Sequence, residues 1–283
     1  MIYVYKDDVC PRGLFAYVWT VLDAIRKLEP EDLLYVDLTT GIPTYYDPNY
    51  TRTNNVWDYY FQQPFNLTED CYNSEHKIYY YNGEDVGTTF IFGIKNGKYR
   101  LAHTTKIRAE GKRLVDKYIR FQPHILTKVE DFYSANIKNK NVVGVHIRGG
   151  SMYTPNPGSH GHGDWYPELG QTEYYYPFVD AELEHHDAVF LMANNLDSRE
   201  KFKARYGNRL LHYDSDLLSD GPVDLTWLHN DRNYEKGEVA VIEILLLNHC
   251  NKMLLTSSNI GLFATLYGNT PYQYLDEHVQ VHY

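Results

Sequence analysis

A chain of 283 residues with a formal net charge of −10 is long enough for two globular domains and too acidic to wrap nucleic acid. Hydrophobic residues make up 43% and charged residues 23%, which excludes a wholly disordered or fibrous chain. Tyrosine contributes 28 residues. The tyrosine ring is flat and apolar and its hydroxyl is polar, so this composition favours ligands such as sugars. The alternative is that it reflects only the general amino-acid usage of the lineage.

The sequence has no feature of secretion or of membrane insertion. The three Cys residues lie far apart and cannot all pair, so we expect a reducing compartment and no disulfide framework. The first residues lack the basic and apolar stretches of a signal peptide. The longest apolar run, 239–247, is too short to span a bilayer. We expect a cytoplasmic protein with no membrane partner.

The first half of the chain predicts a mixture of helices and strands. Apolar spacing predicts a helix over 13–27 and a strand over 33–36, followed by a Tyr-, Asn- and Pro-rich stretch over 41–73. A strong helical pattern covers 106–136, and Pro123 should kink or split it. We expect the domain boundary after this helix, with domains of 1–138 and 139–283.

The second half alternates short apolar runs with helical patterns. We expect strands over 141–147, 188–193, 209–213, 252–256 and 272–275, and helices over 172–184, 197–206, 236–249 and 260–267. Strands that alternate with helices predict an α/β fold with a doubly wound parallel sheet. Ligands of such sheets bind outside the carboxyl ends of the strands.

Polar residues follow three of these strands, and the first group is Arg148 with Gly149. A guanidinium is a planar fork of donors that matches phosphate oxygens, and glycine lets backbone amides approach a ligand. Arg148 therefore indicates a diphosphate contact. The alternative is an ordinary salt bridge in a surface loop.

The other two groups are Asn194 with Asn195, and Ser257, Ser258 and Asn259. The serines and Asn259 follow a strand and open a helix, where hydroxyl and amide N–H groups form a ready anion site. The alternative for them is a plain helix N-cap.

Glu243 stands inside a helix that is apolar on every face. Such a helix should be buried, and a buried carboxylate without partners is costly, so Glu243 needs donors. Nucleoside hydroxyls, base N–H groups or Arg148 are the candidates. The alternative is a structural ion pair, or a helix edge that reaches solvent.

A long loop that contains Gly and Pro, 151–170, follows Arg148 and holds His160, His162 and Asp164. Alternating His, His and Asp are metal ligands in hydrolases with an HxHxDH motif, but Trp165 stands where the last His belongs. The loop also fits a flap over the active site that supplies a general base. Both interpretations stay open at this point.

The order of these motifs resembles the fucosyltransferase-like superfamily, which includes α1,6- and protein O-fucosyltransferases and bacterial and viral members. The resemblance rests on the runs 146–148, 190–195, 238–247 and 256–259, and on 13–15 and 55–61 near the N-terminus. Its specific part covers 143–263. The Tyr-rich chain also looks like algal-virus enzymes that build capsid glycans.

The resemblance implies a GT-B architecture of two Rossmann-like domains, with the acceptor on the N-terminal side and the nucleotide sugar in the C-terminal domain. It implies inverting transfer without a metal. By position, Arg148 corresponds to the diphosphate ligand and Glu243 to the nucleoside-binding carboxylate. Ser258 and Asn259 correspond to the phosphate-binding pair.

Two departures from the family pattern leave the donor open. Gly149 replaces a second Arg, and Ser151 stands in the usual acidic neighbourhood. GDP-fucose is the family's default donor, and UDP-xylose is the rival, which would make the protein a xylosyltransferase.

We therefore expect an inverting glycosyltransferase that acts on a glycan. Asp164 is the expected base, with His162 and Glu168 as its substitutes, and no metal or other cofactor is expected. The rival functions are a non-catalytic nucleotide-sugar or glycan-binding protein, and a metallohydrolase centred on His160, His162 and Asp164.

Overall fold

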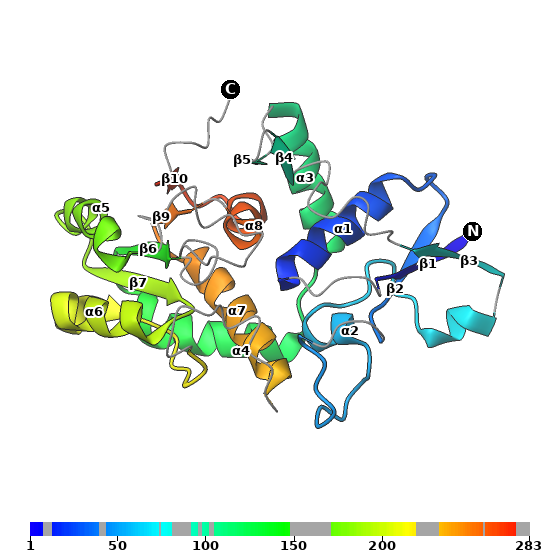
Figure 1. Cartoon of the computed structure of the whole chain (residues 1–283), viewed down its shortest axis with the longest axis horizontal. Coiled ribbons are helices and arrows are strands. Elements are labelled where there is room, and N and C mark those ends of the chain that lie inside the picture. Colours follow the sequence, from blue (N-terminus) through cyan, green and yellow to red (C-terminus); the bar gives the residue numbers. More distant parts are fainter. Residues whose placement is uncertain are drawn as a thin grey trace, which may run out of the picture. The chain divides into compact units, whose positions relative to one another are not determined.

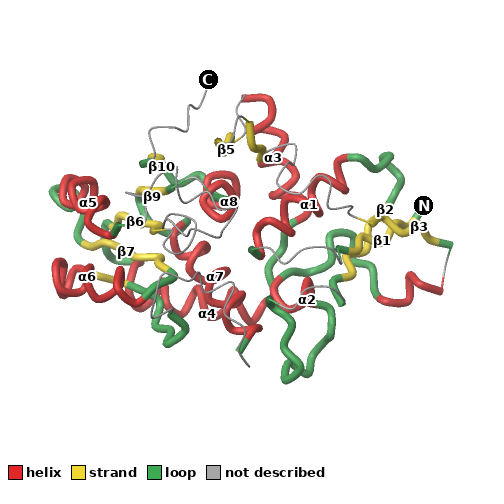
Figure 2. The backbone as a smooth tube through the Cα atoms, in the orientation of Figure 1, coloured by secondary structure: helices red, strands yellow, loops and turns green. Residues whose placement is uncertain are grey.

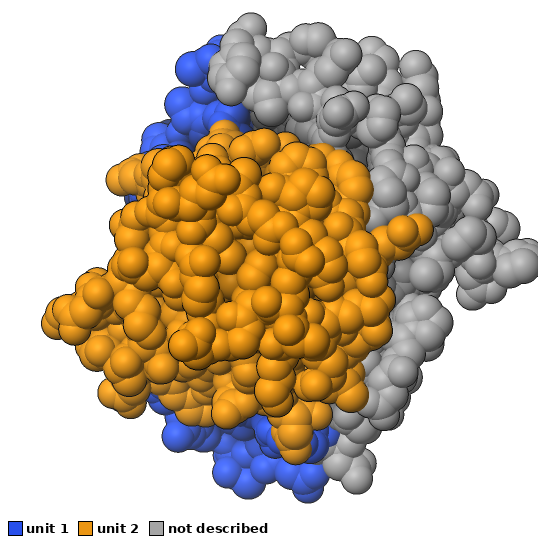
Figure 3. All heavy atoms as spheres, turned by 90° about the vertical axis from the view of Figure 1, so that its left-hand side faces the viewer, with its two compact units in different colours: residues 1–126, 229–238, 280–283 blue, residues 127–228, 239–279 orange. Residues whose placement is uncertain are grey.

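The computed structural model describes ten segments of the chain: residues 1–7, 13–39, 44–73, 75–80, 92–95, 98–101, 105–147, 171–218, 232–256 and 258–275. They form two compact units, coloured separately in Figure 3. Unit 1 holds the described residues of Met1–Leu126 and His229–Glu238, and unit 2 those of Thr127–Leu228 and Val239–Val279. The first boundary between units thus precedes residue 138, and unit 1 includes a short segment from the second half of the chain.

Unit 1 is built on a three-stranded parallel sheet of order β2-β1-β3 (Figure 2). Its strands are β1 (Ile2–Lys6), β2 (Leu33–Asp37) and β3 (His76–Tyr80). The predicted first helix is α1 (Leu14–Arg26), which connects β1 to β2. The remaining elements are α2 (Val56–Tyr60), the 3-10 turn Glu69–Asn73, the antiparallel pair β4 (Phe92–Lys95) and β5 (Lys98–Leu101), and α3 (Thr105–Tyr118).

The core of unit 1 uses aromatic residues heavily. Its largest fully buried side chains include Trp19, Trp57, Tyr5, Tyr59 and Tyr60. Burial of aromatic rings supplies large apolar area, and the hydroxyl of a buried Tyr usually finds a partner. The Tyr5 hydroxyl, for example, donates to Thr20 Oγ1 at 2.8 Å. Part of the tyrosine content therefore serves the core.

β2 is an edge strand of the described sheet, and side chains cover its free backbone. The Gln63 amide bonds both polar groups of Val36, accepting from its N–H at 2.8 Å and donating to its carbonyl at 2.9 Å. The Asn55 amide donates to the same carbonyl and accepts from the N–H of Leu38. An edge covered in this way does not pair with another chain.

The segment 232–238 packs into the aromatic cluster of unit 1. The ring of Tyr234 stacks on that of Tyr50, with 4.3 Å between centroids. The Tyr60 hydroxyl donates to the carbonyl of Tyr234 at 2.8 Å, and Tyr234 in turn donates to Glu238 Oε1 at 2.6 Å. Asn233 donates to the carbonyl of Tyr46. These contacts join parts of the sequence that lie far apart.

Unit 2 is a five-stranded parallel sheet of order β10-β9-β6-β7-β8 with helices on both faces (Figure 1). Its strands are β6 (Val142–Ile147), β7 (Ala188–Ala193), β8 (Leu210–Leu211), β9 (Lys252–Leu255) and β10 (Tyr272–Tyr274). Its helices are α4 (Pro123–Phe132), α5 (Tyr176–Glu182), α6 (Leu196–Tyr206), α7 (Asn233–Leu247) and α8 (Asn259–Tyr267), the first turns of α4 and α7 belonging to unit 1. The predicted α/β fold with a doubly wound parallel sheet is confirmed.

The two faces of this sheet follow from the alternation of side chains along its strands. The odd-numbered residues of β6 and β7 share a core with Val179 of α5 and Phe202 of α6. Even-numbered residues face the other layer: a Cβ at Gly144 would lie 2.6 Å from Leu247 of α7, and Phe190 contacts Phe132 of α4. Both faces are therefore buried, which explains the unbroken apolar runs of these strands.

Most predicted elements of the second half are present within two or three residues of their expected ends. The exception is the strand expected over 209–213, of which only Leu210–Leu211 is extended in the sheet. Arg209 instead donates to the carbonyls of Leu183 and His186. The residue thus holds the loop before β7, and the strand is left as a very short edge, which limits pairing with other chains.

In the segments that the structure describes, no helix combines the length and the apolar character needed to cross a bilayer.

Candidate active site

The carboxyl edge of the unit 2 sheet contains the point where the strand order reverses. β7 and β8 lie on one side of β6, whereas the later strands β9 and β10 lie on its other side. Open α/β sheets bind their ligands outside the strand ends at such a switch point, which here lies between β6 and β9. The strand ends at this edge are Ile147, Ala193 and Leu255.

Several residues expected in the site lie outside the described residues. They are Arg148 and Gly149 directly after β6, Ser257 after β9, and the loop residues His160, His162, Asp164 and Glu168. Their roles stay predictions. The described residues at the edge are Asn194, Asn195, Ser258 and Asn259, and Glu243 is a buried residue of α7 in the same unit.

Ser258 is the N-cap of α8. Its Oγ accepts from the N–H of Gly261 at 2.9 Å, and its backbone is extended, as expected for a cap. A Cβ at Gly261 would lie 3.9 Å from His146 Nδ1, which places the end of β6 beside this first turn. The positive end of α8 therefore lies at the β6–β9 switch point, where it favours an anion. Capping and anion binding are compatible, because other N–H groups of the first turn remain.

Asn194 and Asn195 leave the same edge at the end of β7. Ala193 is opposite Ile147 in the parallel ladder, so both strands end at one level. Asn195 caps α6: its Oδ1 accepts from the N–H of Ser198 at 2.7 Å. The side-chain oxygen of Asn195 thus has a structural partner at the start of α6.

Glu243 is buried, as its helix predicts. Its residue is 6% exposed, and it makes no hydrogen bond or salt bridge with any residue that the structure describes. Burial raises the pKa of its carboxyl group to about 8, and the positive charge of Arg199 opposes the shift. A structural ion pair, the alternative considered above, is therefore not present among the described residues. The carboxyl group is left for a ligand that brings its own donors.

Sequence reasoning missed Arg199, and it named Thr256 only as part of the run 256–259. Arg199 lies one turn after Asn195 and donates to the carbonyls of Ser215, at 2.8 Å, and Tyr213. Its positive charge acts on Glu243 and opposes the rise in the pKa of that carboxyl group. The signal in the sequence was a cation in the first two turns of the helix after Asn194. Thr256 directly follows β9, is fully buried, and its hydroxyl has no hydrogen-bond partner in the described residues.

Unit 1 also has polar residues at the carboxyl edge of its sheet, which no sequence motif predicted. Asp7 follows β1 and is 1% exposed, and Asp37 ends β2. Asp37 accepts from Thr39 and Tyr72 and pairs with Lys6 Nζ at 3.0 Å. These hydrogen bonds outweigh the effect of burial and lower the pKa of Asp37. A carboxylate held in this way is a poor proton acceptor.

No three His, Cys, Asp or Glu side chains within the described segments are arranged to hold a metal ion. His160, His162 and Asp164, the ligands of the metallohydrolase hypothesis, are outside those segments.

Gly261→Ala tests the packing at the start of α8. The added methyl would meet the carbonyl oxygen of Thr256 at 2.7 Å and Ser258 Oγ at 3.1 Å, and a backbone oxygen cannot move away cheaply. We expect a loss of about 1–3 kcal/mol in unfolding free energy and weaker nucleotide binding. Urea denaturation with and without GDP measures both. Gly13→Ala, which meets nothing within 4 Å, is the control. A Gly261→Ala protein as stable as this control would contradict the packing.

No protein-family profile and no curated protein matches the chain. Solved structures do match its fold. Fucosyltransferase NodZ from Bradyrhizobium has a TM-score of 0.59 at 12% identity, with 98% of this chain and 96% of NodZ covered. NodZ alpha-1,6-fucosyltransferase co-crystallised with GDP has a TM-score of 0.58 at 12% identity, over 94% and 92% of the two chains. A mutant of Arabidopsis thaliana FUT1 in complex with GDP has a TM-score of 0.53 at 12% identity, over 96% of this chain and 69% of FUT1. The chain thus shares the two-unit α/β fold of these solved fucosyltransferase structures.

Proposed function

We propose that the protein is an inverting glycosyltransferase that moves a sugar from a nucleoside-diphosphate donor to a hydroxyl group of a glycan. The observation that carries the proposal is the N-terminus of α8 at the β6–β9 switch point. The same unit holds the buried carboxyl group of Glu243, which has no partner among the described residues. The first suits a diphosphate and the second suits the hydroxyl or N–H donors of a nucleoside. Similar solved structures were determined with GDP or GDP-fucose.

The proposed reaction needs a base and a stabilised leaving group. The acceptor hydroxyl loses its proton to the base, and its oxygen forms a bond to the anomeric carbon of the donor sugar. The bond from that carbon to the phosphate oxygen breaks, and its electron pair leaves with the nucleoside diphosphate. Arg148, Ser257, Ser258 and the α8 terminus are proposed to stabilise this leaving charge. Asp164 is the proposed base, and no metal takes part.

GDP-fucose is the proposed donor and UDP-xylose its rival, since the sequence lacks a second Arg beside Arg148. Thermal shift with GDP, UDP and their sugar conjugates tests this choice. A ligand present at about 100 times its dissociation constant stabilises the protein by roughly 2.7 kcal/mol. Transfer of labelled sugar to glycans then separates an enzyme from a binding protein. A protein that none of these nucleotides stabilises does not have the proposed function.

Arg148→Ala is expected to weaken donor binding about 10- to 150-fold, because a charge-assisted contact to phosphate is worth about 1.5–3 kcal/mol. Titration calorimetry with the donor measures the loss. Arg205→Ala is the control, since Arg205 pairs with Asp180 on the exposed surface of unit 2. If folded Arg148→Ala binds the donor as well as the control, Arg148 is not the diphosphate ligand.

A further inference from the structure

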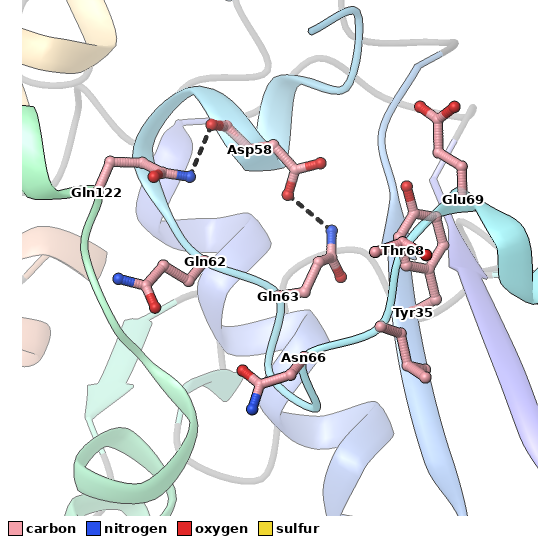
Figure 4. Close-up of a pocket in the computed structure, with 9 residues that line it drawn as sticks. Tyr35, Asp58, Gln62, Gln63, Asn66, Thr68, Glu69 and Gln122 are labelled. Carbon is pink, nitrogen blue, oxygen red and sulfur yellow. Dashed lines mark hydrogen bonds between the residues drawn. The ribbon is translucent and has the colours of Figure 1, made fainter. Parts of the chain in front are cut away.

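Unit 1 contains a pocket of about 400 Å³, and none of its lining residues belongs to the switch-point site of unit 2 (Figure 4). Its wall is formed by Tyr35 of β2, Asp58 of α2, residues 62–63 and 66–69, and Gln122. All of these residues belong to unit 1. The pocket is thus complete within one unit.

The turn that forms one side of this pocket is held by Arg120. Its Nη2 donates to the carbonyls of Gln63, at 3.0 Å, and Pro64, at 3.2 Å, and to Asn66 Oδ1 at 3.0 Å. Asn66 takes the left-handed backbone conformation, with φ of 54°, that closes the turn. A wall fixed before a ligand arrives costs little conformational entropy on binding.

The opposite side is fixed by amide groups. Gln122 Nε2 donates to the carbonyls of Asp58 and Phe61, both at 2.9 Å, and Gln62 Nε2 donates to the carbonyl of Phe121 at 3.1 Å. Figure 4 shows Asp58 between Gln122 and Gln63, which donates to Asp58 Oδ1 at 2.8 Å. The side-chain oxygens of Gln62 and Gln122 accept no hydrogen bond from the described residues. The groups of Gln62 and Gln122 that remain available to a ligand are therefore mainly their side-chain oxygens, which accept hydrogen bonds.

Charge makes the pocket selective. Asp58 and Glu69 line it, and no Lys, Arg or His is among its lining residues. Burial raises the pKa of Asp58 to about 6, opposed by the amides of Gln63 and Asn55, so the carboxylate is ionised at neutral pH without a cation beside it. An anionic ligand such as a second nucleotide is repelled here. A neutral ligand with many hydroxyl donors matches the acceptor oxygens.

We infer that this pocket binds a neutral sugar ring of the glycan acceptor, with the Asp58 carboxylate and the oxygens of Gln62 and Gln122 accepting from its hydroxyl groups. The inference rests on the proposed function, because it assigns the acceptor of that reaction.

The experiment measures binding of methyl fucoside, methyl xyloside and methyl galactoside to the full chain by saturation-transfer NMR. Glucosamine and glucuronate are the charged comparisons. At least one neutral glycoside is expected to bind more tightly than either charged sugar. If glucosamine binds best, the pocket takes cationic amines, and if no neutral glycoside binds at millimolar concentration the inference is wrong.

Two variants test whether the neutral glycoside binds in this pocket. Asp58→Asn removes the charge and keeps the shape, and Thr68→Trp fills the pocket from an exposed position without touching a buried contact. Each is expected to weaken the neutral glycoside about tenfold or more. Asp116→Asn, on the exposed face of α3, is the control. Binding left intact in both variants would overturn the inference.

Donor binding separates this inference from the proposed function. The thermal shift produced by the preferred nucleotide sugar is expected to be the same in Asp58→Asn, in Thr68→Trp and in the unaltered protein, while KM for the glycan rises. If nucleotide sugars bind and transfer proceeds but neither variant changes KM for the glycan, only the pocket assignment fails. If no nucleotide sugar binds, the proposed function fails.

Discussion

Glu243→Gln is expected to remove the largest single contribution to the pH dependence of stability between about pH 5 and pH 8. The pKa of the carboxyl group is about 8 in the folded protein and near its ordinary value of 4.5 in the unfolded chain. In this window the folded state holds a proton that the unfolded state has lost. Stability therefore falls as the pH rises from the unfolded pKa to the folded one, by on the order of 5 kcal/mol in total.

The variant lacks this loss, because glutamine stays neutral at every pH. Urea denaturation at pH 5, 7 and 9 is expected to give similar midpoints for the two proteins at pH 5 and a more stable variant at pH 9. Asp58, whose pKa is also raised, contributes to both proteins and cancels in the difference. Glu184→Gln, at an exposed site of unit 2, should behave like the unaltered protein. Parallel pH profiles for Glu243→Gln and the unaltered protein would show that Glu243 is ionised when folded.

The same group should make nucleotide binding depend on pH. A nucleoside that donates to the Glu243 carboxylate favours its ionised form, so binding releases a proton below the folded pKa. Affinity for a nucleotide sugar, whose phosphates do not titrate in this range, is then expected to rise up to tenfold per pH unit toward pH 8. In Glu243→Gln the affinity should be lower at pH 8 and nearly flat. Calorimetry in two buffers of different ionisation enthalpy measures the released proton directly.

Asp164→Asn is expected to lower kcat by about 10²–10⁴, the usual contribution of a general base, with donor affinity nearly unchanged. Proton removal belongs to the transition state, so its loss appears in kcat and not in ground-state binding. Steady-state kinetics with donor and glycan varied in turn, plus a direct donor titration, separate the two effects. Asp214→Asn, at a highly exposed carboxylate of unit 2, is the matched control.

The same experiment distinguishes a base from a metal ligand in this loop. With Asp164 as base, activity survives a strong chelator. With a metal bound, Asp164→Asn, His160→Ala and His162→Ala fail alike and the chelator abolishes turnover. Full activity in Asp164→Asn would eliminate it as the base and would move the role to Glu168 or His162.

The local sequence pattern was enough to predict most helices and strands of unit 2. Its strands are buried on both faces and appear as apolar runs, and its helices have clear start and stop signals in the sequence. It also predicted the burial of Glu243, because a helix that is apolar on every face is buried together with the carboxylate it carries. β1 was missed, although Ile2, Tyr3, Val4 and Tyr5 favour a strand.

The features that sequence did not predict depend on contacts between distant residues. The pocket of unit 1 is made by Gln63 covering the edge of β2 and by Arg120 fixing the turn after it, and neither pairing has a local pattern. The membership of 232–238 in unit 1 likewise rests on Tyr234 meeting Tyr50 and Tyr60. Periodicity cannot report such partners, because it reads only neighbours along the chain.

The return of 232–238 to unit 1 has a consequence for synthesis on the ribosome. Protein domains generally fold in order as the chain emerges, the N-terminal one first. Here the aromatic cluster around Tyr50 and Tyr60 lacks Tyr234 until most of unit 2 has been translated. A nascent or truncated chain that ends before residue 232 therefore exposes tyrosine rings that the finished protein covers, and it is expected to need a chaperone or to aggregate. Completion of the first unit must wait for translation of the second.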